Sequence, residues 1–229
     1  MAMQFYVPPE QQMREKADFA RRGISRGRSV VAMTYAGGAL FVADNPSAHL
    51  YKLSEIYDRI GFAAVGKYSE FEQLRVGGIR IADVKGYQYA REDVTGRALA
   101  NAYANALGST FTDSPKPFEV ELIVAEVTDV AVELYHILFD GSITDEDGAV
   151  AIGGNAEAVN ERLRAAFRPG LERGEAVRVA TAALAGPDEP APTAARLEVA
   201  GLDRDRGRRT FFRLTEDEVA ADLVGPQGD

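Results

Sequence analysis

Two apolar runs joined by a pair of glycines constrain the fold of this chain more than any other feature. Residues 29–35 are apolar at odd and even positions alike, and residues 39–44 form the returning run. Gly37 and Gly38 between them can adopt the positive φ angles of a tight hairpin. A strand that is apolar on both faces must be covered on both faces, so the pattern predicts a strand sandwiched inside a layered structure.

The rest of the chain alternates between groups of strands and pairs of helices. We expect two short strands within 53–66, and others at 118–127, 131–139, 148–153, 196–203 and 208–214. Helices are expected at 8–22, from Ser69 onward, at 91–108, 155–167 and 173–185, and from Thr215 onward. Paired helices between groups of antiparallel strands indicate two stacked sheets with a helix layer on each outer face, a four-layer αββα sandwich of the α+β class.

Local signals predict several helix ends. Ser69 followed by Glu72, and Thr215 followed by Glu218, have the spacing of a capping box. Gly108 follows a strongly periodic apolar stretch and is expected to end that helix. With 229 residues, the chain suits one large domain, which we place at 8–224, between a flexible segment at 1–7 and a disordered tail at 225–229.

The charge balance excludes several classes of partner. The sequence has 26 Lys and Arg against 35 Asp and Glu, a net charge of −9, which argues against nucleic-acid binding and against docking on an anionic membrane. One hairpin is rich in arginine, but Asp203 and Asp205 alternate with these residues, so charge protection of a strand edge explains it better than nucleic acid: Arg204, Arg206, Arg208, Arg209 and Arg213.

Cysteine is absent, which excludes disulfides, thiolate metal sites and a cysteine nucleophile. His49 and His136 are the only histidines, so neither a metal site nor a cofactor is expected. No apolar run approaches the ~20 residues that span a membrane. The first residues lack the pattern of a signal peptide, and we therefore expect a cytoplasmic protein.

Two short motifs favour structural roles. Gly23 to Gly27 matches G-x-S-x-G, but the order here is helix before and strand after Ser25, the reverse of a nucleophile elbow. Ile152-Gly153-Gly154-Asn155 ends a strand and begins a helix without a dinucleotide or Walker signature, so we interpret it as a helix N-cap rather than an anion site.

Longer segments carry a family resemblance. Residues 28–44 (RSVVAMTYAGGALFVAD) and 50–62 (LYKLSEIYDRIGF) resemble proteasome α subunits, most of all those of actinobacteria. The similarity extends from about Pro8 to about Leu223 and includes residues 93–107, 116–127 and 140–142. The resemblance implies the αββα fold of the N-terminal-nucleophile hydrolases, with an additional N-terminal helix, in agreement with the element order above.

The same resemblance bears on catalysis. Catalytic β subunits of the family begin with a threonine nucleophile supported by an aspartate and a lysine, and these positions correspond to Arg28, Asp44 and Lys52 here. A guanidinium is permanently protonated and cannot attack a carbonyl, so the resemblance implies a chain without catalytic residues. The alternative is a self-processed amidohydrolase or peptidase in which cleavage exposes Ser29 as the nucleophile.

The resemblance also implies roles for non-catalytic residues. A lysine matching Lys52 receives the C-terminal carboxylate of an activating ATPase in pockets between α subunits; an intrasubunit ion pair is the alternative. The helix at 8–22, whose Met13, Ala17 and Ala20 share one face, would contact neighbouring α subunits. The segment before it would form an axial gate, with gate residues Met3, Gln4, Phe5, Tyr6 and Val7, although the Tyr-Asp-Arg gate motif of archaeal and eukaryotic relatives is absent.

Together these features predict a structural and gating subunit. Its expected partners are six further copies in a seven-membered ring, catalytic proteasome β subunits, a hexameric AAA ATPase that docks by its C-terminal tails, and unfolded proteins in transit. Neither nucleic acid nor a membrane is expected as a partner.

Overall fold

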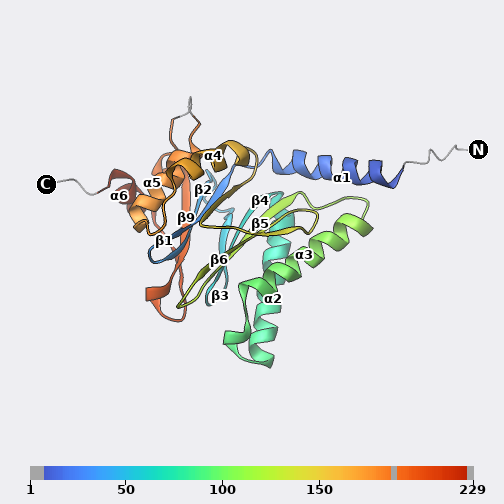
Figure 1. Ribbon diagram of the computed structural model, residues 1–229, viewed down its shortest axis with the longest axis horizontal. Coiled ribbons are helices and arrows are strands. Elements are labelled where there is room, and N and C mark those ends of the chain that lie inside the picture. The colour runs from blue at the N-terminus through green and yellow to red at the C-terminus, as the bar shows by residue number, and fades with distance from the viewer. Residues whose placement is uncertain (1–7, 187–189, 226–229) are drawn as a thin grey trace, which may run out of the picture.

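Two antiparallel sheets of five strands each lie face to face in the computed structural model, which describes residues 8–186 and 190–225 (Figure 1). The first sheet has the order β10-β9-β2-β1-β8, and the second has the order β3-β4-β5-β6-β7. The strands are β1 (Val30–Tyr35), β2 (Gly38–Asp44), β3 (Leu53–Tyr57), β4 (Ile60–Gly66), β5 (Val120–Val127), β6 (Val132–Ile137), β7 (Ile143–Asp145), β8 (Ala149–Ile152), β9 (Leu197–Asp203) and β10 (Phe211–Arg213).

Helices cover the outer face of each sheet. They are α2 (Tyr68–Gln88), α3 (Gly96–Asp113), α4 (Ala156–Ala166), α5 (Arg173–Leu184) and α6 (Glu216–Val224), with 3₁₀ turns at Arg91–Asp93, Ala194–Arg196 and Arg204–Arg206. Helix α1 (Pro9–Ile24) covers neither outer face. Helices α2 and α3 pack on the second sheet, while α4 and α5 pack on the first (Figure 1). The predicted αββα sandwich is confirmed.

The central hairpin shows why both of its faces are apolar. In β1, Val30 and Ala32 point into the core between the sheets, whereas Val31 and Met33 point outward under α4 and α5. The hairpin closes with Tyr35 opposite Gly38. Only Gly38 of the glycine pair has a positive φ, so the expectation that both would adopt one was wrong for Gly37.

Two predicted helix ends were wrong. Helix α2 begins at Tyr68 with Lys67 as its N-cap and no side-chain capping bond, so Ser69 lies inside the first turn. Helix α3 continues past Gly108 to Asp113. Gly108 therefore lies inside the helix, where a Cβ would make only an ordinary contact of 3.4 Å with the Asp140 carbonyl oxygen. The crowded position is Gly141, in the turn after β6, whose φ is positive and where a Cβ would lie 2.5 Å from the Ala104 carbonyl oxygen.

Other boundaries followed the pattern more closely. Thr215 and Glu218 form the predicted capping box of α6. Strand β7 was not predicted, because three residues with partly exposed side chains leave too little periodicity to detect. Within the described part of the chain, no helix is both long and apolar enough to cross a membrane.

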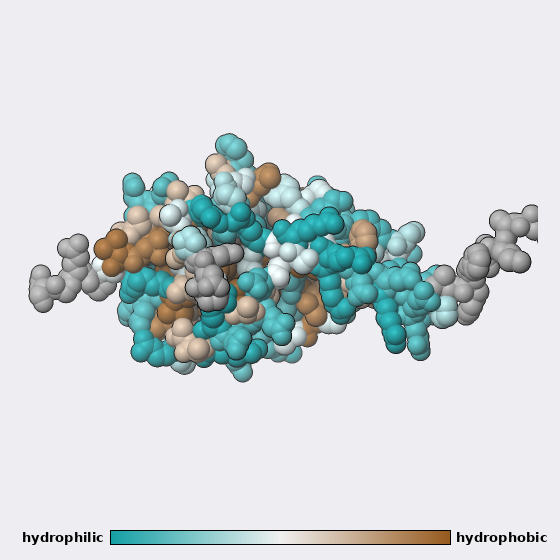
Figure 2. Space-filling view, turned by 90° about the horizontal axis from the view of Figure 1, so that it is seen from above, coloured by the Kyte–Doolittle hydropathy of each residue, from teal (hydrophilic) through white to brown (hydrophobic). Residues whose placement is uncertain are grey.

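Helix α1 extends away from the sandwich as an arm (Figure 1). Only its last turns enter the core, where Ala20 and Ile24 are buried between the sheets. Seen from above, the surface of this arm is mainly hydrophilic (Figure 2). The arm therefore depends on few contacts within its own chain.

Candidate functional site

The site lies where the beginnings or ends of three strands meet beside the last turn of α1. Arg28 comes just before β1, Asp44 ends β2 and Lys52 comes just before β3. The Lys52 Nζ donates hydrogen bonds to the carbonyl oxygens of Arg28 at 2.8 Å and of Asp44 at 3.4 Å. The structure thus brings together the three positions that the sequence pattern had matched to a catalytic set.

Two arginines form ion pairs with the Asp44 carboxylate. Arg28 Nη1 lies 2.5 Å from Asp44 Oδ2, and Arg196 Nη2 lies 2.7 Å from the same oxygen. Arg196 precedes β9 and was not singled out from the sequence. Because the carboxylate is paired with guanidinium groups, Lys52 reaches only the main-chain oxygen of Asp44. The cluster is therefore a set of ion pairs around Asp44, and Arg28 is not an activated nucleophile.

Lys52 is partly buried, and its charge is poorly compensated. Burial lowers the pKa of its ammonium to about 8, although the negative charges of Asp44 and Glu198 oppose this shift. Among the described residues, no carboxylate oxygen lies within 4.0 Å of the Nζ, so the expected alternative of an intrasubunit ion pair does not appear there. An ammonium has three donors, and two of them are used here.

Ser29 is buried at the start of the hairpin, and its hydroxyl accepts a hydrogen bond from the Asn155 backbone N–H at 3.3 Å. Helix α1 continues to Ile24, two residues past the expected end at 22, so Gly23 lies inside it. Ser25 is the C-cap and donates to the Arg22 carbonyl at 3.0 Å, with a helix before it and a strand after it, unlike a nucleophile elbow. Asn155 is the N-cap of α4, as predicted, but makes no side-chain capping bond.

A pocket of about 600 Å³ opens beside the cluster, lined by Ser25, Arg26, Gly27, Arg28, Ser29, Asp44, Gly154, Asn155, Leu184 and Arg196. Its charged lining is three arginines against one aspartate, which suits anionic rather than cationic ligands. No group of three metal-ligating side chains occurs in the ranges that the structure describes.

A buried glutamate next to Lys52 was missed. Glu198 in β9 accepts hydrogen bonds from the backbone N–H groups of Lys52 at 2.9 Å and Leu53 at 3.1 Å. It also pairs with Arg213 at 2.5 Å. An acidic residue inside the otherwise apolar strand LEVAGLD was the available signal.

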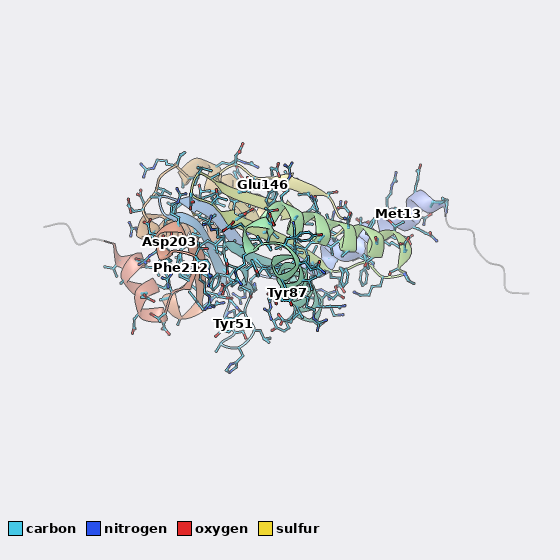
Figure 3. All side chains as sticks on the ribbon, turned by 90° about the horizontal axis from the view of Figure 1, so that it is seen from below. Met13, Tyr51, Tyr87, Glu146, Asp203 and Phe212 are labelled. Carbon is cyan, nitrogen blue, oxygen red and sulfur yellow. The ribbon has the colours of Figure 1, made fainter. Side chains whose placement is uncertain are left out.

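The predicted contact face of α1 is only partly available. Ala20 is fully buried and Ala17 packs against the core between the sheets, so Ala20 cannot contact a neighbouring subunit. The prediction for Ala20 was wrong because its helix face covers this chain's own core. Met13 and Phe19 are the exposed apolar residues of the arm (Figure 3 shows Met13). The predicted gate residues, 3–7, lie outside the described residues.

Comparisons with known proteins identify the family of this chain. Residues 24–189 match the family model described as "Proteasome subunit". The chain therefore belongs to the proteasome subunit family, whose αββα architecture it shares.

Within that family, the chain is similar to actinobacterial proteins named "Proteasome subunit alpha". It is 60% identical to the one of Streptosporangium roseum, over 93% of this chain and 84% of that protein. It is 58% identical to that of Saccharopolyspora erythraea over 94% and 86%, and 53% identical to that of Xylanimonas cellulosilytica over 100% and 99% of the two chains. These similarities support a non-catalytic subunit of a proteasome core.

Proposed function

We propose that this chain is an α subunit that forms seven-membered outer rings of a cytoplasmic bacterial proteasome, templates the catalytic β rings, gates substrate entry and docks a hexameric ATPase. The observation that carries the proposal is Arg28 at the nucleophile position. Its guanidinium is paired with Asp44 at 2.5 Å. The helix ahead of it is also part of the fold, because Ala20 and Ile24 complete the core between the sheets.

Lys52 is the proposed docking residue for an ATPase tail. Its two carbonyl acceptors leave one N–H for a further acceptor. A C-terminal carboxylate supplies both the hydrogen bond and the charge that this partly buried ammonium lacks. Burial lowers the pKa of Lys52 because its charge is poorly compensated, and a docked carboxylate would supply the missing compensation.

The arm supports the proposed contact between α subunits. Met13 and Phe19 expose apolar surface on a helix that makes few contacts with its own chain. Residues 1–7 precede this arm, so a ring built through α1 would bring seven such segments to one end of the assembly. In this proposal they form the gate for unfolded chains.

An apolar surface at the far end of α2 suits the catalytic β subunits. Four residues there are exposed: Ile81, Val84, Tyr87 and Tyr89. Figure 1 shows this end of α2 at the bottom of the view, away from α1 at the upper right, and Figure 3 shows Tyr87 at the surface. If the arm and the gate face outward, this surface faces the inner rings. Aromatic residues are enriched in protein interfaces.

A self-processed hydrolase with Ser29 as nucleophile is the second candidate. One contact favours it: Lys52 Nζ donates at 2.8 Å to the Arg28 carbonyl oxygen. This carbonyl belongs to the Arg28–Ser29 peptide bond, which processing would break. Cleavage there would remove α1 and expose apolar core that Ala20 and Ile24 now cover. This cost favours the α-subunit proposal.

Intact mass spectrometry separates the two candidates. The chain is purified in complex with the catalytic β subunit of the same bacterium. A mass near 24.8 kDa supports the α-subunit proposal. A fragment that begins at Ser29 would overturn it and identify a self-processed hydrolase.

A further inference from the structure

The loop between β2 and β3, residues 45–52, contains no helix or strand, yet it carries Lys52. A lysine side chain can point at a ligand only if the backbone at its base is held in place. Main-chain hydrogen bonds hold one group at each end, the Asn45 N–H on the Arg196 carbonyl at 2.8 Å and the Lys52 carbonyl on the Ala64 N–H at 3.1 Å. The N–H of Lys52 and the amide of Asn45 need a further partner from elsewhere in the fold.

Glu198 is that partner, because its carboxylate contacts both ends of the loop. At the beginning, Asn45 Nδ2 donates to Glu198 Oε2 at 2.7 Å. At the end, the N–H of Lys52 donates to Oε2 at 2.9 Å and that of Leu53 to Oε1 at 3.1 Å. The same Asn45 amide also donates to the Leu50 carbonyl at 2.8 Å. One carboxylate therefore clamps the loop closed.

We propose that Glu198 is a positioning residue for Lys52, which holds the loop at 45–52 so that the ammonium is aimed at the carboxylate of an incoming tail. The inference rests on the proposed function of Lys52 as the docking residue. Nothing in the comparisons assigns a role to Glu198.

Arg213 pairs with the Glu198 carboxylate, which is only 8% exposed. Arg213 Nη1 lies 2.5 Å from Glu198 Oε1, and its Nη2 donates to the Leu53 carbonyl at 2.7 Å. The guanidinium also lies 4.2 Å from the centre of the Tyr51 ring, in the same loop. A buried ion pair with this many hydrogen bonds specifies one arrangement of the groups around it.

Glu198 acts on Lys52 through its negative charge as well as through its hydrogen bonds to the loop. Three charged groups act on the ammonium: Asp44 and Glu198 favour the charged form, and Arg28 opposes it. The two carboxylates are themselves paired, Glu198 with Arg213 and Asp44 with Arg28 and Arg196. Removing the negative charge at position 198 will therefore lower the pKa of Lys52 further. A role limited to structural support would not move this pKa.

The test uses the complete complex of this chain with its β partner. The probe is a fluorescent peptide with the last ten residues of the regulatory ATPase of the same bacterium, measured by anisotropy against pH. The Glu198→Gln variant keeps the size and one acceptor oxygen but removes the charge. We expect binding about fivefold weaker at neutral pH, with loss of binding beginning at lower pH than in the wild type.

Glu126→Gln is the matched control. Glu126 is also buried, 7% exposed, and accepts a backbone N–H from Gly96 at 2.7 Å, away from Lys52. We expect its tail binding and pH profile to match the wild type. If Glu198→Gln binds with wild-type affinity and an unchanged pH profile, or if Glu126→Gln produces the same shift, the proposal is wrong.

Two further samples keep the outcomes distinct. A peptide with an amidated C-terminus and the Lys52→Ala variant test docking itself. If neither weakens binding, the proposed function of Lys52 fails before Glu198 is considered.

Should Glu198→Gln not assemble, Asn45→Ala releases one end of the loop but retains the Glu198–Arg213 pair. Weaker binding with an unshifted pH profile supports positioning, and unchanged binding overturns it.

Discussion

At the scale of single residues, the properties of Lys52 come from burial without a carboxylate partner. Its ammonium is held by two carbonyl oxygens, and the pKa falls to about 8. A free carboxylate binds the protonated form. The proposed docking should therefore be strongest below pH 8 and weaken as the pH rises through this value, because the deprotonated amine carries no charge.

This predicts a pH-dependent activation. ATPase-stimulated degradation of an unfolded protein should fall as the pH rises from about 7 to about 9, while hydrolysis of a small peptide by the same complex follows only the β subunits. Lys52→Ala should lose the stimulated activity at every pH and keep peptide hydrolysis. Lys52→Arg, which stays charged, is the control for pH effects elsewhere; an identical decline in Lys52→Arg would contradict the assignment.

At the scale of elements, α2 contains two adjacent glycines with opposite environments. A Cβ at Gly77 would meet no atom within 4 Å, whereas a Cβ at Gly78 would lie 1.7 Å from the Tyr103 hydroxyl oxygen. The two positions share a helical backbone but differ in what faces them. Their substitutions are therefore expected to have opposite signs.

We expect Gly77→Ala to stabilise the chain by about 0.5–1 kcal/mol, because alanine reduces the backbone entropy lost in a helix. Gly78→Ala should destabilise it by about 1–3 kcal/mol, because Tyr103 must move. Denaturant unfolding of the two variants and the wild type measures both. A gain in stability for Gly78→Ala would show that α2 and α3 are packed less closely than the structure indicates.

Element boundaries show where sequence patterns stop being informative. Periodicity located α3, but Gly108 was mistaken for its end, because a glycine inside a helix and a glycine at a C-cap look the same in one sequence. Only the helix itself, which continues to Asp113, distinguishes them. The same limitation applies to Ala20, since an amphipathic helix has one apolar face whether it covers its own core or a neighbour.

At the scale of the whole molecule, exposed large apolar residues occur both on α1 and at the end of α2, which lie apart from each other in the fold (Figure 1). Contiguous exposed apolar residues mark interfaces with other proteins. Two separate surfaces suit a subunit that contacts copies of itself with one and a different partner with the other.

Tyr87→Asp tests the second surface. Tyr87 is 92% exposed, so the substitution should leave the folded chain unchanged. A buried charge in the proposed interface should reduce assembly with β subunits severalfold. Native mass spectrometry of the co-expressed chains measures the assembled fraction. Val224→Asp, on another exposed apolar residue at the end of α6, should assemble normally; equal losses in both variants would refute the specific role of α2.

The sequence by itself determined the layered sandwich and the central hairpin, because these follow from local periodicity, and its family resemblance placed Arg28 at the position of a nucleophile. The tertiary structure alone decided how Lys52 is buried and what holds it. Asn45 and Glu198 are separated by 153 positions and meet only because β9 pairs with β2. Hydrogen bonds and desolvation depend on such distances in space, and a local pattern does not contain them.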